Sequence, residues 1–287
     1  MRVILVPMSD RPESKTALKV AAGIADSLDA NLIGCHLRPH RDLSTDYKST
    51  SLPLFGHPDQ GWIKHAAKKG SASSTKRAEK AFSQITEKAG FAAVKKPRKN
   101  MRKSAIWHEM VGTPNKLMAI QGPVADLTVV SRPAAKAKVA KIFMMAALMH
   151  SGRPVLILPQ DQKTLPGKRV AIAWNQSAEA MRNVSACMPV LQQAEVVTVI
   201  SCGPENRPGP KSKHLQDYLK TYGVDSKILH SRGKVEEKEL MSAYKDSKSD
   251  LLLMGAYSRA RFREVVFGGM THYMLSKARI PVLMLHS

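Results

Sequence analysis

The chain has 287 residues, which is enough for two domains of ordinary size. Hydrophobic residues make up 43% and charged residues 24%, a balance typical of a soluble globular protein that excludes an intrinsically disordered chain. No apolar run approaches the roughly 18 residues of a membrane-spanning helix, and the N-terminal run MRVILVPMSD is too short for a signal peptide. We therefore expect a cytoplasmic protein with no membrane partner.

The net charge of +22 is spread unevenly along the chain. Residues 1–160 hold 26 basic and 11 acidic residues, whereas residues 161–287 hold 19 and 12. The basic surplus is densest in two runs, 64–80 and 95–103, and such a field attracts polyanions through counterion release. The alternative, which we favour, is a solvated surface. No RNP-like, helix-turn-helix or zinc-finger pattern accompanies the runs, so nucleic acid is not an expected partner.

The three cysteines, Cys35, Cys187 and Cys202, are far apart and odd in number. No CxxC pair and no His–Cys cluster with zinc spacing is present, so the sequence predicts neither a disulfide framework nor a metal site. We expect these cysteines to be small buried apolar residues.

In chain order, the first half alternates short apolar runs with helical stretches. Strands are expected where apolar residues run without polar alternation, and helices where Ala-rich stretches follow them. The expected elements are strands over 2–10, 30–37, 124–132 and 151–159, and helices over 15–28 and near 72–90. Residues 92–126 hold a third strand and a further helix whose limits the pattern does not fix. The Pro- and Gly-containing segment 160–168 is typical of a linker.

The second half repeats this order. RVAIAWNQS (169–177) parallels RVILVPMSD (2–10), and SDLLLMGAYSR (249–259) parallels VADLTVVSR (124–132). Asp126 and Asp250 precede the matching strands. The remaining expected elements are a helix over 178–191, a strand over 194–201, a strand and helix within 224–250, a helix starting near 270 and a last strand within 277–287.

Apolar strands separated by helices predict a parallel sheet covered on both faces. The repeat therefore predicts an α/β fold of two similar domains, residues 1–160 and 168–287, each with a parallel, Rossmann-like sheet and helices on both faces.

The order of elements and the glycine-containing segment 255–271 together resemble the universal stress protein family. The family signature is Gly, two residues, Gly, nine residues, Gly, and then Ser or Thr. Gly255 takes the first place, Ser258 replaces the second glycine, Gly268 takes the third, and Gly269 replaces the Ser or Thr. Two of the four signature positions are therefore altered.

This resemblance covers nearly the whole chain as a tandem pair of domains, each similar to the adenine nucleotide alpha hydrolase-like fold. It implies a stress-response protein that binds ATP or AMP in its second half, with Mg²⁺ accompanying ATP. In the first half, Ser131, Ala134 and Met144–Met145 stand at the glycine places, which implies a degenerate site. Family domains dimerise near the last strand, so PVLILP and PVLMLH are expected to meet as an intramolecular pseudo-dimer; a homodimer remains open.

The general properties of parallel sheets and helix termini indicate where a nucleotide would bind. Parallel sheets bind ligands outside the carboxyl ends of their strands, where glycine permits close approach and a helix N-terminus favours an anion. Asn175 stands where the family has an acidic residue that meets the adenine or its sugar. The alternatives are a tight turn for the glycines, a helix cap for Ser177 and a core-edge position for Trp174. The expected nucleotide-binding residues are Trp174, Asn175, Gly255, Ser258, Arg259, Gly268, Gly269, Met270 and Thr271.

Catalysis finds little support in the sequence. It contains no GxxxxGK[ST] loop, no GxSxG elbow, no HExxH and no GxGxxG opening the first βα unit. We expect binding rather than turnover and no catalytic residue, although slow ATP hydrolysis stays open. The alternatives are a nucleotide-independent interaction protein, and polyanion binding through the basic first half.

Overall fold

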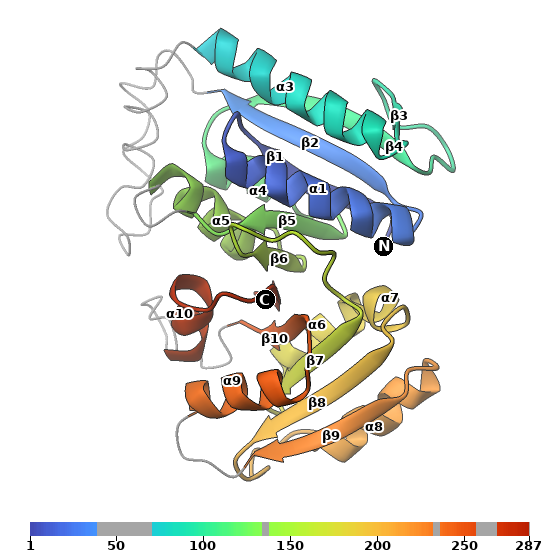
Figure 1. Cartoon of the computed structure of the whole chain (residues 1–287), viewed down its shortest axis with the longest axis vertical. Helices are drawn as coiled ribbons and strands as arrows, with labels where there is room; N and C mark the ends of the chain where they lie inside the picture. Colours follow the sequence, from blue (N-terminus) through green and yellow to red (C-terminus); the bar gives the residue numbers. More distant parts are fainter. Residues whose placement is uncertain (39–70, 134–137, 232–235, 257–268, 287) are drawn as a thin grey trace. The chain divides into compact units, whose positions relative to one another are not determined.

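The structure is a computed structural model that describes residues 1–38, 71–133, 138–231, 236–256 and 269–286. The chain divides into two compact units (Figure 1). Unit 1 consists of Met1–Arg153 with Gln160–Lys163, and unit 2 consists of Pro154–Pro159 with Thr164–Ser287.

Unit 1 contains a parallel sheet in the order β3-β4-β2-β1-β5. Its strands are β1 (Val3–Met8), β2 (Asn31–Arg38), β3 (Ala92–Ala93), β4 (Ser104–Val111) and β5 (Leu127–Ser131). Figure 1 shows α1 and α3 on one face of the sheet and α4 and α5 on the other. These helices are α1 (Pro12–Ser27), α3 (Ser71–Lys88), α4 (Pro114–Gln121) and α5 (Lys138–His150). The predicted parallel sheet with helices on both faces is confirmed.

Unit 2 repeats the arrangement with the strand order β11-β10-β7-β8-β9, all parallel. Its strands are β7 (Arg169–Trp174), β8 (Val196–Cys202), β9 (Ser226–Ser231), β10 (Leu251–Gly255) and β11 (Val282–Leu285). Its helices are α6 (Ala178–Ala186), α7 (Met188–Leu191), α8 (Ser212–Thr221), α9 (Glu236–Asp246) and α10 (Gly269–Ser276). The order β9-β8-β7-β10 corresponds to β4-β2-β1-β5 in unit 1.

One further strand, β6 (Val155–Leu158), lies beside β11 in unit 2 and runs antiparallel to it. Ile157 pairs with Val282 and Val155 pairs with Met284. The sequence assigns this strand to the first half, but its backbone hydrogen bonds join it to the last strand of the second. The apolar segments PVLILP and PVLMLH therefore pair within unit 2, whereas a pseudo-dimer of the two halves stays a prediction.

Two predicted elements differ from the structure. The single helix predicted over 178–191 is wrong at Cys187, where α6 ends and α7 begins. Pro189 has no N–H to continue the hydrogen-bond ladder of α6, which explains the break. In the stretch 92–126, the structure places the short strand β3, a loop and the longer strand β4 before α4. The helix predicted near 72–90 is confirmed as α3.

The core of each unit lies between the sheet and its helices. The side chains of Ile4, Leu5 and Val6 on β1 are fully buried, and so are those of Val170, Ala171 and Ile172 on β7. Burial on both faces of these strands is the arrangement that uninterrupted apolar runs predict. Cys35 and Cys187 are buried as expected, whereas Cys202 is half-buried. None of the helices in the described part of the chain is long and apolar enough to cross a membrane.

Candidate functional site

The candidate site lies at the carboxyl edge of the sheet in unit 2. Because β7 and β10 run parallel and pair directly, Trp174 at the end of β7 and Gly255 at the end of β10 lie at the same edge. The turn into α6 starts there, and α10 belongs to the same unit. This is the edge at which parallel α/β sheets bind ligands.

Gly255 lies directly against the first turn of α6. A Cβ atom at this position would lie 2.8 Å from the backbone N of Ala180 and 3.1 Å from the carbonyl carbon of Glu179. These contacts involve backbone, which cannot move aside, so only glycine fits without a shift. Close packing of strand against helix thus accounts for this glycine whether or not a ligand is bound.

Gly269 is the first residue of α10. Met270 follows it half-buried, and Thr271 is buried. The N–H groups of a first helical turn have no partner within the helix and attract an anion. The carboxylate of Glu237 on α9 comes close to this helix start, because its Oε1 lies 2.7 Å from the position that a Cβ at residue 269 would take. The sequence did not reveal this acidic neighbour.

The turn after β7 is organised by its own side chains. Ser177 is the N-cap of α6, and its Oγ accepts a hydrogen bond from the N–H of Ala180 at 3.1 Å, which confirms the capping role. Asn175 Oδ1 accepts from the N–H of Ser177 at 3.2 Å. Between them, Gln176 adopts φ +60°, the left-handed region that a glutamine seldom enters.

The segment 203–211 after β8 packs onto this turn. The indole N–H of Trp174 donates to the carbonyl of Pro210 at 2.8 Å, and Trp174 is buried. The N–H of Arg207 donates to Gln176 Oε1 at 3.1 Å. Trp174 therefore has the core-edge position that the sequence left open. Contact between its ring and a base stays a prediction.

Gln176 is the polar residue at this edge that sequence reasoning missed. Its side chain is buried, and its Nε2 has no hydrogen-bond partner within the described part of the chain. A buried amide donor without a partner is costly, which makes this atom a candidate for contact with a bound molecule. No sequence signal marks it, because its burial comes from segment 203–211.

The predicted residues thus fall into three groups. Trp174, Asn175 and Gly255 lie together at the ends of β7 and β10, where the first turn of α6 contacts Gly255. Gly269, Met270 and Thr271 form the start of α10. Ser258, Arg259 and Gly268 lie outside the described residues. The described ranges contain no group of three or more His, Cys, Asp or Glu side chains able to hold a metal ion.

The corresponding edge of unit 1 has larger side chains. Ser131 at the end of β5 is buried, and Met144 on α5 is buried as well. Arg132 is also buried, which lowers the pKa of its guanidinium to about 10 and leaves it charged at neutral pH. Ala134 lies outside the described residues. A degenerate nucleotide site in this half stays a prediction.

Known proteins are similar to the chain in sequence and in fold. The model of the universal stress protein family matches residues 168–286. A curated relative, universal stress protein Slr1230 of Synechocystis, is 27% identical over 141 residues, and the aligned stretch covers 46% of each chain. The chain thus spans about half the length of this relative.

Two solved structures share the fold over almost all of the chain. A universal stress protein of Archaeoglobus fulgidus matches with a TM-score of 0.68 and 13% identity, over 99% of this chain and 95% of its own. A putative universal stress protein of Pseudomonas aeruginosa matches with a TM-score of 0.56 and 14% identity, over 99% and 93%. Residues 168–286 thus match the universal stress protein family in sequence, and the chain as a whole shares the fold of these two solved structures.

Proposed function

We propose that the second half of this chain binds an adenine nucleotide, ATP or AMP, and that binding rather than turnover is its function. The observation that supports this most is the placement of two signature positions, both occupied by glycine in this chain. Gly255 ends β10 at the carboxyl edge of the sheet, and Gly269 opens α10. The segment between them contains the remaining signature positions, Ser258 and Gly268.

The phosphates would bind at the start of α10. The free N–H groups of its first turn and the helix dipole favour an anion, and glycine at 269 leaves the approach open. The Glu237 carboxylate beside this position opposes a bare phosphate by charge repulsion. Magnesium is commonly held by one or two carboxylates together with nucleotide phosphates, so Mg²⁺ brought by ATP would offset this repulsion.

The base or sugar would bind near the turn after β7. Asn175 Oδ1 already accepts a hydrogen bond from Ser177. Gln176 offers a buried Nε2 without a partner among the described residues, so it is the stronger candidate for donating to the ligand. We therefore add Gln176 to the nine residues that the sequence suggests.

A thermal-shift titration tests the proposal. ATP, AMP and inorganic phosphate are added at low and high salt, with and without Mg²⁺, and co-purified ligand is sought by mass spectrometry. A ligand that binds only the folded state raises the melting temperature with its concentration. The Gly268→Val variant fills the third signature position, and Ser83→Val on the exposed side of α3 in unit 1 serves as its control.

A shift with nucleotide that persists at high salt, is retained in Ser83→Val and is lost in Gly268→Val supports the proposal. No shift beyond that produced by phosphate contradicts it. That result would favour the second candidate, a nucleotide-independent protein that acts through protein partners. The observation behind this candidate is the Glu237 carboxylate beside the start of α10, together with the two altered signature positions.

A further inference from the structure

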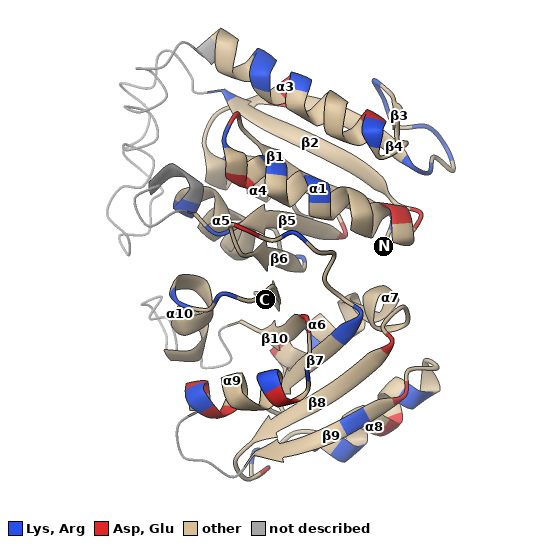
Figure 2. Cartoon of the chain, in the orientation of Figure 1, with Lys and Arg blue, Asp and Glu red and all other residues tan. Residues whose placement is uncertain are grey.

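The loop between β3 and β4 in unit 1 is the most basic described segment of the chain. Six of its nine residues 95–103, KKPRKNMRK, are Lys or Arg, and all six are exposed. Figure 2 shows this loop in blue next to β3 and β4. The proposed nucleotide site in unit 2 does not involve it.

The loop has a defined base. The buried Asn31 donates from Nδ2 to the carbonyl of Met101 at 2.9 Å, and its Oδ1 accepts from the N–H of Ser104 at 3.1 Å. The N–H of Val94 donates to the carbonyl of Ala105 at 3.0 Å. Two residues, Asn100 and Lys103, adopt positive φ angles. Hydrogen bonds to the strands therefore hold the base of the loop.

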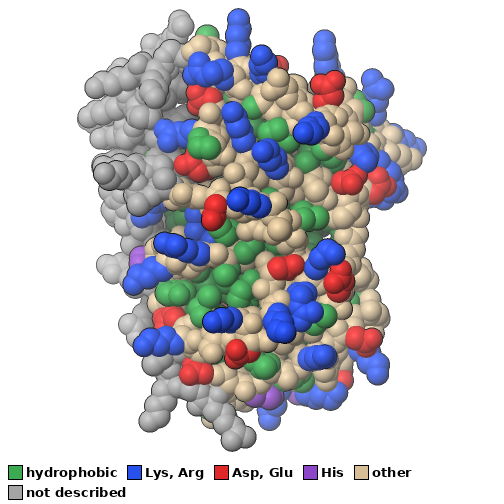
Figure 3. All heavy atoms as spheres, viewed as in Figure 1, with side chains coloured by type: hydrophobic (Ala, Val, Ile, Leu, Met, Phe, Trp, Pro, Cys, Tyr) green, Lys and Arg blue, Asp and Glu red, His purple; other side chains and the backbone are tan. Residues whose placement is uncertain are grey.

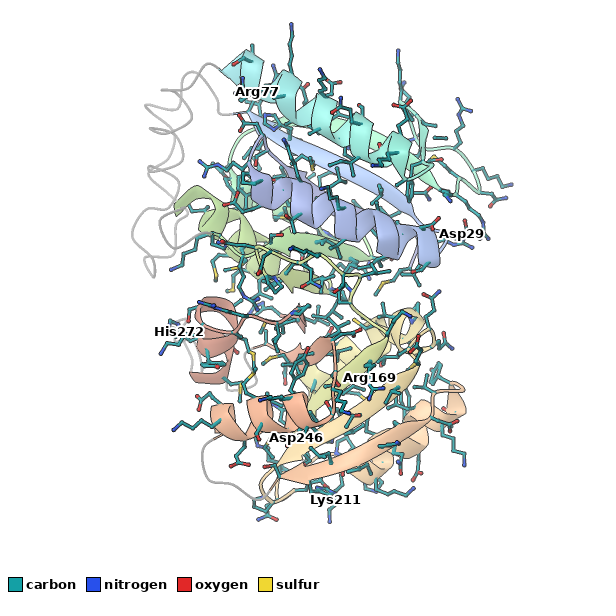
Figure 4. The ribbon with its side chains drawn as sticks, viewed as in Figure 1. Asp29, Arg77, Arg169, Lys211, Asp246 and His272 are labelled. Atoms are coloured by element: carbon teal, nitrogen blue, oxygen red, sulfur yellow. The ribbon has the colours of Figure 1, made fainter. Side chains whose placement is uncertain are left out.

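Nearby carboxylates neutralise only the base of the loop. Asp29 pairs with Arg102, and Asp26 pairs with Lys103 across 2.6 Å. Figure 4 shows Asp29 beyond the end of α1, on the same side of unit 1 as the loop. The remaining four cations have no ion pair with any described residue; they are Lys95, Lys96, Arg98 and Lys99. Their charge is therefore available to an external anion.

Further cations lie on the helices beside the loop. The base of the loop adjoins the C-terminal end of α3, since a Cβ at Gly90 would lie 3.6 Å from Cε of Lys103. The solvent-exposed lysines on α1 and α3 are Lys15, Lys19, Lys76, Lys80 and Lys88. Figure 3 shows Lys and Arg side chains projecting from this face of unit 1. Loop and helices thus present an extended surface with a surplus of cations, although α3 also exposes Glu79 and Glu87.

We propose that this surface, the loop 95–103 with the exposed lysines of α1 and α3, binds the phosphate backbone of a nucleic-acid duplex without reading its sequence. Lys and Arg side chains release condensed counterions when they neutralise phosphates, and this supplies most of the free energy of non-specific binding. Such binding needs no recognition motif, which is why motif reasoning did not predict it.

The uncharged residues of the surface favour a duplex over the other polyanions. Phe82 and Phe91 are buried and Trp107, which packs against Phe82, is half-buried, so the described part of the surface offers no fully exposed ring on which the bases of a single strand would stack. Its exposed positions also include no large apolar side chain of the kind that anchors a protein in a lipid interface.

The test measures the anisotropy of a short fluorescein-labelled DNA duplex of mixed sequence as protein is added, over a series of salt concentrations. Vesicles of phosphatidylserine and phosphatidylcholine are assayed in parallel by co-sedimentation. Two variants lose the same amount of charge. The loop variant carries Lys95→Gln, Lys96→Gln, Arg98→Gln and Lys99→Gln. The control carries Lys220→Gln, Lys227→Gln, Lys238→Gln and Lys245→Gln, all exposed in unit 2.

We expect the loop variant to bind the duplex roughly tenfold or more weakly at low salt. The slope of its log binding constant against log salt concentration should be smaller in magnitude by about 3 to 4. The control is expected to stay within about twofold of the unmodified chain, because its charges lie off the surface. Circular dichroism confirms that both variants are folded. The proposal is overturned if the duplex does not bind, if both variants weaken equally, or if vesicles bind and the duplex does not.

Discussion

The carboxylate of Asp250 accepts a hydrogen bond from the backbone N–H of Arg169 across 3.1 Å. It also accepts from the N–H groups of Gly167 and Lys168, at 2.9 and 3.2 Å. In unit 1 the carboxylate of Asp126 accepts from the N–H of Val3 at 3.0 Å. In each unit an aspartate just before a central strand fixes the start of the neighbouring strand, so the Asp126–Asp250 match in the sequence has a structural cause.

Replacing Asp250 by Asn should destabilise unit 2. A neutral amide has one acceptor oxygen in place of two charged ones, and it cannot satisfy three N–H donors equally well. We expect a loss of about 1–3 kcal/mol in the free energy of unfolding, measured by urea denaturation. Asp225→Asn, at an exposed position before β9, is the control. Equal stability of the two variants would show that the Asp250 hydrogen bonds contribute nothing.

The two described glycines at signature positions, Gly255 and Gly269, should differ in their tolerance of a methyl group. Gly255→Ala places Cβ against the backbone of α6, so we expect a loss of about 1–3 kcal/mol. At Gly269 the close contact is the end of a flexible glutamate side chain, which can rotate away. Gly269→Ala should therefore melt within a few degrees of the unmodified chain in calorimetry. A Gly255→Ala variant more stable than Gly269→Ala would show that the contact of Gly255 with the α6 backbone does not require glycine.

Acid should weaken unit 1 through His36. Burial lowers the pKa of this imidazole, while a hydrogen bond to the Met8 carbonyl and the charges of Glu109 and Asp10 partly offset the effect. The unfolded chain then binds the proton more readily, so stability is complete above the ordinary histidine pKa of about 6.5 and is lost as pH falls towards the folded value.

His36→Gln should reduce this dependence. The urea midpoint of unit 1 is measured between about pH 5 and pH 8 in both proteins. The slope of stability against pH gives the difference in bound protons between the unfolded and folded states. The unmodified chain should lose more stability towards acid than the variant. If the stability of the two proteins depends on pH in the same way, a titratable group other than His36 causes the loss of stability in acid.

Glu237→Gln tests the charge beside α10. Removal of one negative charge near the proposed phosphate position should strengthen binding of AMP without Mg²⁺ by a factor of about 3 to 10, as expected for one charge pair partly screened by water. Titration calorimetry measures this change. With MgATP the gain should be smaller or reversed, because the carboxylate then faces a cation. Unchanged affinity under both conditions would place the phosphates elsewhere.

The sequence predicted the fold well because its signals are local. Apolar runs, the repeat and the paired Asp126 and Asp250 all follow from short stretches of chain. The site was harder to predict because its neighbours come from distant segments. Glu237 reaches Gly269 from α9, and Pro210 covers Trp174 from the loop after β8. The left-handed conformation of Gln176 could not be predicted either, since Gly, Asn and Asp are the residues that usually adopt it.

The most direct test of nucleotide binding is isothermal titration calorimetry of the full chain with MgATP at high salt, repeated with Gly268→Val. The number of nucleotides bound per chain distinguishes the possible outcomes, because only the second half retains signature glycines. We predict one nucleotide per chain, with the heat abolished in Gly268→Val. Two nucleotides per chain would contradict a degenerate first half, and the absence of binding heat at every temperature tried would contradict nucleotide binding itself.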